Sequence, residues 1–91
     1  SDLNPVRRKI LHMLKEPKIH FHQPYADADE VGVCVSIIQE KIGLSQSTVS
    51  LYLSSLQRAQ LVTSQRIGPW TYYKRDNDKI RAVLELLKNT I

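Results

Sequence analysis

The chain contains little cysteine, glycine or tryptophan, and these shortages limit what it can be. Its 91 residues include one cysteine, three glycines and one tryptophan. The single cysteine, Cys34, excludes an internal disulfide and fits a reducing compartment, so we expect a cytoplasmic protein. No apolar run approaches the roughly 18–20 residues that span a bilayer. We therefore expect no membrane segment and no signal peptide.

Motifs that carry enzymatic chemistry are also missing. The sequence shows no nucleophile motif, no glycine-rich phosphate loop and no paired carboxylates in a plausible cleft, so we do not expect an enzyme. What it does contain fits one small domain, residues 1–91, with 42% hydrophobic residues and a net charge of +4. A core of this size is marginal, which favours a partner subunit. The positive charge is compatible with nucleic acid but does not by itself indicate it.

The most informative stretch, residues 45–60, contains no carboxylate and is predicted to form a helix with two unlike sides. Ser45 is a suitable N-cap, because its hydroxyl can accept from the amide of Ser47 or Thr48. One side is apolar at helical spacing, apart from its last residue, and comprises Val49, Leu53, Leu56 and Gln60. The other side is small and polar and comprises Ser47, Ser50, Leu51, Ser54 and Arg58, with Gln46 and Gln57 at its flanks. Such a surface can approach a polyanion and bond to base edges; the alternative is an ordinary solvated surface.

A shorter helix is predicted just before this one. Ser36 and Gln39 have the spacing of a capping box, and Gly43 is a natural left-handed residue at a helix end. Two helices joined by a glycine-containing turn predict a helix-turn-helix over residues 36–60.

A β-hairpin, or wing, is predicted over residues 61–75. Two β-branched and aromatic segments flank a Gly68-Pro69 turn. Arg66, Lys74 and Arg75 place cations on this hairpin. We interpret Trp70 as a packing residue.

Helices are expected at both ends of the chain, over residues 4–16 and 78–89. Asn4 and Pro5 begin the first and Pro17 ends it, while Asp76 or Asn77 caps the second. A wing and a helix-turn-helix alone cannot cover both apolar stripes well. We therefore expect the two helices to pair with their counterparts in a homodimer. Cations of the first helix, Arg7, Arg8 and Lys9, are expected to be solvated or to contact phosphates.

The region between these elements is the least informative. Residues 19–22 alternate and predict a briefly extended segment, and residues 31–35 predict a short buried strand. An acidic cluster of Asp27, Asp29 and Glu30 lies between them.

The order of these elements and the sequence of the central motif resemble those of the ArsR-type winged-helix repressors. The matching residues run from Ile42-Gly43-Leu44-Ser45-Gln46-Ser47-Thr48-Val49-Ser50, through Leu53 and Leu56, to Ala59-Gln60-Leu61-Val62. The wing residues Arg66-Ile67-Gly68, Trp70 and Tyr72-Tyr73 are also similar. The resemblance covers most of the chain, from about Asn4 to Leu87.

The resemblance implies a fold that is mainly helical with a small hairpin, and a homodimeric repressor of transcription that binds double-stranded DNA. By carry-over, residues facing the bases are Gln46, Ser47, Thr48, Ser50 and Leu51, and Arg66 faces the phosphates. Tyr52 packs at the core edge and offers its hydroxyl to a phosphate. Ser54, Arg58 and Lys74 complete the predicted DNA-binding set. Many members have two histidines where this chain has Leu51 and Tyr52, so the operator sequence does not carry over.

Many relatives sense metals, but the ligand motifs that they use are incomplete in this sequence. The familiar cysteine-valine-cysteine is Cys34-Val35-Ser36 here, and a hydroxyl is a poor ligand for soft metals. The last helix has no histidine for the second familiar site. One unorthodox zinc site remains as a hypothesis, with His20 and His22 on one side of a strand, Cys34, and an acid from residues 27–30. We favour surface histidines, His12 included, and a buried apolar cysteine, and expect no cofactor.

Two other functions stay open beside a repressor with an unknown effector. One is a metal-responsive repressor that uses the unorthodox site. The other is a winged-helix module that binds another protein. Such a module does not need a recognition surface that is basic and free of acids.

Overall fold

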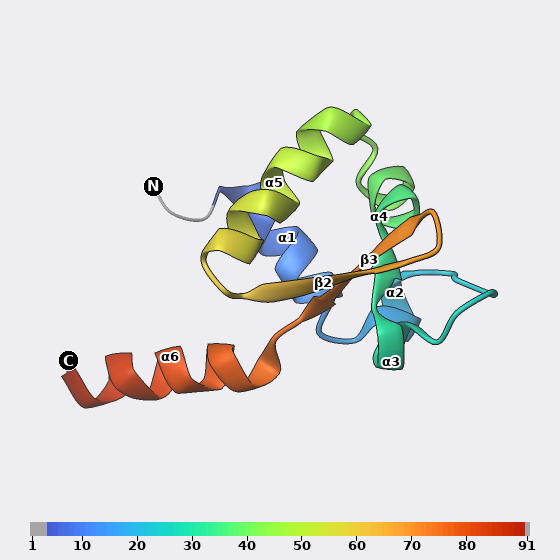
Figure 1. Cartoon of the computed structure of the whole chain (residues 1–91). Helices are drawn as coiled ribbons and strands as arrows, with labels where there is room; N and C mark the ends of the chain where they lie inside the picture. Colours follow the sequence, from blue (N-terminus) through green and yellow to red (C-terminus); the bar gives the residue numbers. More distant parts are fainter. Residues whose placement is uncertain (1–3, 91) are drawn as a thin grey trace.

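Six helices and three strands make up residues 4–90, the part of the chain that the computed structural model describes (Figure 1). In order they are α1 (Pro5–Met13), α2 (Pro17–His20), α3 (Ala28–Val31), β1 (Val33–Cys34), α4 (Val35–Ile42), α5 (Gln46–Arg58), β2 (Val62–Ile67), β3 (Trp70–Arg75) and α6 (Asn77–Thr90). This confirms the predicted fold class, mainly helical with a small hairpin. The molecule measures 42 × 26 × 23 Å, and α6 projects from its body (Figure 1). No helix within these residues is long and apolar enough to cross a membrane.

Helix ends follow the sequence closely where a polar side chain caps them. The Arg7 amide donates to Asn4 Oδ1 over 2.9 Å, the Thr48 amide to Ser45 Oγ over 3.2 Å, and the Lys79 amide to Asp76 Oδ1 over 2.9 Å. Each bond satisfies an amide that has no partner inside its own helix. Gly43 ends α4 with a φ of +81°, as predicted.

The cap predicted for α4 is wrong. This helix begins at Val35, with Cys34 at the N-cap position and no side-chain capping bond. The Ser36 hydroxyl lies 3.3 Å from Cys34 Sγ instead, and Gln39 Nε2 donates to the Leu44 carbonyl. The reason is tertiary, because Cys34 pairs with Tyr72 in the sheet and fixes where the helix starts.

The region before α4 also differs from expectation. Ile19 and His20 are helical rather than extended, and Phe21 after them is extended. Pro17 opens the short helix α2, since its fixed φ suits a first helical position. Asp27 caps α3 by accepting from the amides of Asp29 and Glu30, so the acidic cluster lies at the positive end of a helix. Lys18 Nζ lies 3.3 Å from Asp27 and links α2 to α3.

The sheet has three antiparallel strands in the order β1-β3-β2. The predicted hairpin is present, with Ile67 opposite Trp70 across the Gly68-Pro69 turn. The extra strand β1 is the predicted buried segment, shortened to two residues. Gly32 precedes it with a φ of +95°, and a Cβ there would lie 2.5 Å from the Tyr73 carbonyl oxygen. Only glycine fits this close approach without movement of the backbone.

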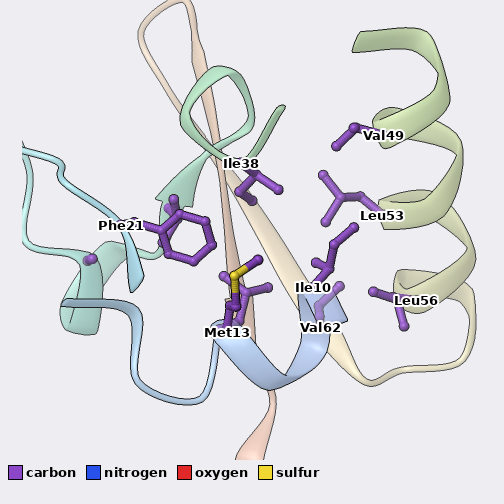
Figure 2. Close-up of a cluster of buried hydrophobic side chains, with 11 residues drawn as sticks. Ile10, Met13, Phe21, Ile38, Val49, Leu53, Leu56 and Val62 are labelled. Carbon is purple, nitrogen blue, oxygen red and sulfur yellow. The ribbon is translucent and has the colours of Figure 1, made fainter. Parts of the chain in front are cut away.

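The core joins α1, α4 and α5 to the sheet (Figure 2). Its labelled members are Ile10, Met13, Phe21, Ile38, Val49, Leu53, Leu56 and Val62. The apolar stripe of α1 is therefore covered within the chain, which corrects the expectation that both terminal stripes stay uncovered. α6 buries Ile80 alone, and Leu84, Leu86 and Leu87 stay exposed.

Candidate nucleic-acid interface

α5 turns a small, polar surface away from the core. Val49, Leu53 and Leu56 are buried, as the helical spacing predicts. On the opposite side Ser47 and Arg58 are exposed, Ser50 and Ser54 are half-buried, and Leu51 is 70% exposed. Leu51 is thus an exposed apolar residue on a polar surface.

The first turn of α5 is ordered by hydroxyl groups. Ser45 Oγ donates to Thr48 Oγ1 over 2.8 Å and lies 3.2 Å from Ser47 Oγ. Gln46, the first residue of the helix, is exposed. The amides at this end carry partial positive charge, which favours an anion such as a phosphate.

One flank of α5 is held by α1. Arg7 Nη1 donates to Ser55 Oγ over 2.6 Å, and the guanidinium carbon lies 6.0 Å from the centre of the Tyr52 ring. Tyr52 packs at the edge of the core, as predicted. Arg7 is part-buried, so the expectation of a solvated or phosphate-contacting side chain is wrong. No local pattern identifies this contact, because its partners lie more than 40 residues apart in the sequence.

The other flank of α5 is joined to the wing. Gln57 Nε2 donates to Ser64 Oγ on β2 over 2.9 Å. Arg66 lies near the tip of the wing, exposed, with its Nε 3.3 Å from the Gly68 carbonyl oxygen. Lys74 is also exposed but lies at the base of the wing, where its Nζ donates to the Glu30 carbonyl.

Arg75, the third predicted wing cation, has a different place. Its Nη1 donates to the Leu11 carbonyl over 3.0 Å and its Nε to Asn77 Oδ1. Burial lowers the pKa of its guanidinium. Arg75 therefore joins the wing to α1 and to the start of α6.

Negative charge is absent over a longer stretch than α5 itself. Residues 41–75 contain no Asp or Glu, and their cations are Lys41, Arg58, Arg66, Lys74 and Arg75. This segment includes all of α5 and the whole wing. A surface built from it can approach a polyanion without repulsion from carboxylates.

Trp70 does not pack into the core. It stands at the wing tip and is half exposed, next to a half-exposed Ile67. The two-residue turn in the sequence is the signal for this position, because residues flanking such a turn lie at the end of a hairpin.

The three candidate metal ligands are not brought together. His20 ends a helix and His22 lies in the following loop, so the two do not share one side of a strand. The His20 ring lies near His12 instead, with the ring centres 5.8 Å apart. Cys34 is fully buried. Within residues 4–90 no three His, Cys, Asp or Glu side chains are grouped so that they can hold a metal ion. The unorthodox zinc site is therefore wrong.

Comparison with known proteins identifies regulators of transcription. The chain is 47% identical over 90 residues to YbzH, an HTH-type transcriptional regulator of Bacillus subtilis, with 97% of this chain and 89% of that protein covered. It is 49% identical over 49 residues to a putative arsenical resistance operon repressor, ArsR2, of Halobacterium salinarum, covering 54% of this chain and 40% of that protein. The solved structure of HlyU from Vibrio cholerae superimposes with a TM-score of 0.64 at 25% identity, covering 96% of this chain and 79% of that one. No family model matches.

Proposed function

The chain belongs to the ArsR family of helix-turn-helix transcriptional regulators, and we propose that it is a homodimeric repressor whose single domain, residues 1–91, reads a pseudo-palindromic operator. As a regulator of this family it binds DNA and is not an enzyme. The observation that carries the proposal is the exposed surface of α5, continuous in sequence with the wing and free of carboxylates from residue 41 to 75.

We assign the first turns of α5 to the major groove. An α-helix fits this groove, where every base pair presents a distinct pattern of donors and acceptors. The base-facing side chains in this assignment are Gln46, Ser47, Thr48, Ser50 and Leu51. An amide such as that of Gln46 can bond adenine with two hydrogen bonds, and Leu51 can pack on a thymine methyl group.

We assign contacts with the DNA backbone to the rest of the interface. Their side chains are Tyr52, Ser54, Arg58, Arg66 and Lys74. The cations neutralise phosphates, which holds the protein on the duplex without reading its sequence. Arg66 and Lys74 are both exposed, and each donates to a backbone carbonyl, Arg66 to Gly68 near the wing tip and Lys74 to Glu30 at the base.

Dimerisation is supported by the uncovered leucines of α6. Exposure of an apolar stripe on a projecting helix is unfavourable, and burial against a second surface would stabilise it. A dimer that holds its two α5 helices about 34 Å apart would match half-sites one helical turn apart. The repressor role is supported by the name of the ArsR2 relative. We further propose that an unknown effector releases the repressor from its operator, and that the protein acts in the cytoplasm.

The test is DNA-affinity selection from genomic fragments, followed by anisotropy titrations of a labelled duplex. Arg66→Ala should weaken all duplexes alike and reduce the slope of log K against log salt by about 1. Gln46→Ala and Ser50→Ala should instead change sequence preference, by about 1–3 kcal/mol at the contacted base pair. Lys15→Ala is the matched control, because it removes an exposed cation outside the interface.

Intact operator binding by the Arg66, Gln46 and Ser50 variants would show that the docking assignment is wrong. A wild-type protein that binds no duplex would favour the alternative, a winged helix that contacts protein. Deleting the gene in its host should raise transcription from the bound promoter; a fall would identify an activator.

A further inference from the structure

Helix α1 carries consecutive cations and no acid. Arg7, Arg8 and Lys9 follow one another near its start, and residues 5–13 contain no Asp or Glu. Arg7 is partly buried, whereas Arg8 and Lys9 are exposed. A helix surface that only faces water usually mixes both signs of charge. This end of α1 instead has a positive field that no carboxylate of the same helix offsets.

The start of α1 is fixed beside α5 (Figure 1). Arg7 Nη1 donates to Ser55 Oγ over 2.6 Å, and its guanidinium carbon lies 6.0 Å from the centre of the Tyr52 ring. Ser55 follows Leu51 by one helical turn, so this bond is made at the edge of the exposed side of α5. The wing is joined to the other flank of the helix through Gln57. α5 therefore lies between α1 and the wing.

The helical repeat decides which cation of α1 turns toward the exposed side of α5. Successive residues of a helix are rotated by about 100°. The buried Ile10 lies about 60° to one side of Arg7, and Arg8 lies about 100° to the other side. Because Arg7 points at α5, Arg8 is turned past it, away from the core and toward the exposed side of α5. Lys9 lies about 160° from Arg7 and points away from α5.

The dimensions of DNA bring a phosphate close to this position. The major groove is about 12 Å wide, so its two backbones lie about 6 Å to either side of a helix centred in it. Two packed helices have axes about 8–10 Å apart. When α5 occupies the groove, α1 therefore lies beside one of the two backbones. A guanidinium suits such a neighbour, because it can give a phosphate two charge-assisted hydrogen bonds.

We propose that Arg8 binds a phosphate of the DNA backbone that borders α5 on the side away from the wing. The inference rests on the proposed function, which places α5 in the major groove. The contact reads no base, but it adds a point of attachment on the α1 side of the recognition helix. Attachment on both sides fixes the rotation of α5 in the groove, and with it the base pairs that each side chain meets.

The first experiment compares Arg8→Ala with Lys9→Ala, which removes the same charge from the opposite side of α1. Anisotropy titrations of the selected operator and of an unrelated duplex are made over a series of salt concentrations. Arg8→Ala should weaken both duplexes and reduce the slope of log K against log salt by about 1 for each protomer bound, which is about eightfold per protomer at 0.1 M salt. Lys9→Ala should leave the slope unchanged. Equal slopes for the two variants would overturn the proposal, because charge alone would then explain the effect.

Both variants should retain the fold, because the replaced side chains are exposed and alanine favours a helix. Circular dichroism checks this.

A second experiment locates the phosphate. Single phosphates of the operator are replaced, one at a time, by uncharged methylphosphonates. At one position on the border of the groove the wild type should lose affinity, Arg8→Ala should not, and Arg66→Ala should lose it as the wild type does. If no position separates the wild type from Arg8→Ala, the proposal is wrong. If the position found is the one to which Arg66→Ala has become insensitive, the contact lies on the wing side and the proposal is also wrong.

The failure of the proposed function gives a different result. A wild-type protein that binds no duplex in the anisotropy titration fails the proposed function, and the Arg8 contact falls with it. A wild type that binds the operator no better than Arg8→Ala refutes the Arg8 contact alone and leaves the docking of α5 in place.

Discussion

Replacing two leucines of α6 should dissociate the proposed dimer while leaving the folded monomer intact. Leu84 and Leu87 lie on the same side of α6 as Ile80, at spacings of four and seven residues. They are 60% and 48% exposed, so about half of each side chain is left for a partner to cover. Full burial of a leucine is worth roughly 1.5–3 kcal/mol, which leaves about 1 kcal/mol to gain per side chain.

A twofold dimer uses each of these leucines twice. The double variant Leu84→Ala and Leu87→Ala should therefore weaken dimerisation by about 4 kcal/mol, close to a thousandfold in Kd. Sedimentation equilibrium measures this shift, and circular dichroism checks that the fold is retained. Retention is expected because α6 buries Ile80 alone in the described structure.

The matched control is Leu86→Ala. Leu86 is also exposed, but two residues from Leu84 places it on the far side of the helix, so its effect on Kd should be much smaller. An equal effect of both variants would refute the argument from helix sides. A wild-type protein that sediments as a monomer at micromolar concentration would refute the interface itself.

Two further predictions concern stability. Gly32→Ala should lower the free energy of unfolding in urea by about 3 kcal/mol or more, since the new Cβ meets the Tyr73 carbonyl; Gly43→Ala, at positive φ but in open space, should cost only about 1–2 kcal/mol. The ion pair with Lys18, together with backbone amides, holds the pKa of Asp27 below its ordinary 3.8. The folded state thus binds fewer protons than the unfolded state, so this stabilisation is present above pH 3.8 and is lost as pH falls through the lowered pKa. Thermal melts between pH 2 and 6 should show a smaller acid loss for Asp27→Asn, and an unchanged profile would contradict this role.

Local signals were enough to predict the helix-turn-helix and the wing. The Ser45 cap, the left-handed Gly43 and the apolar spacing of α5 all act within a few residues, so the sequence specifies them without help from the rest of the fold. The exposed side of α5 follows from the same spacing.

Errors arose where distant residues decide the outcome. The start of α4 depends on the pairing of Cys34 with Tyr72, and the burial of Arg7 depends on Ser55. A four-residue helix such as α2 is too short to show a helical period, so the sequence around His20 predicts an extended segment and a zinc site that the structure does not form. The residue type of Trp70 predicts packing, but its position beside a tight turn leaves it exposed.

The wing and the proposed dimer helix α6 are directly connected in the chain. β3 ends at Arg75 and α6 begins at Asn77, with Asp76 alone between them, and the bond from Arg75 to Asn77 stiffens this joint. A tilt of α6 therefore acts directly on β3, and on α1 through the bond from Arg75 to the Leu11 carbonyl. In the proposed dimer, a change in the crossing of the two α6 helices would reach the wing through β3, and α5 through the bond from Gln57 to Ser64.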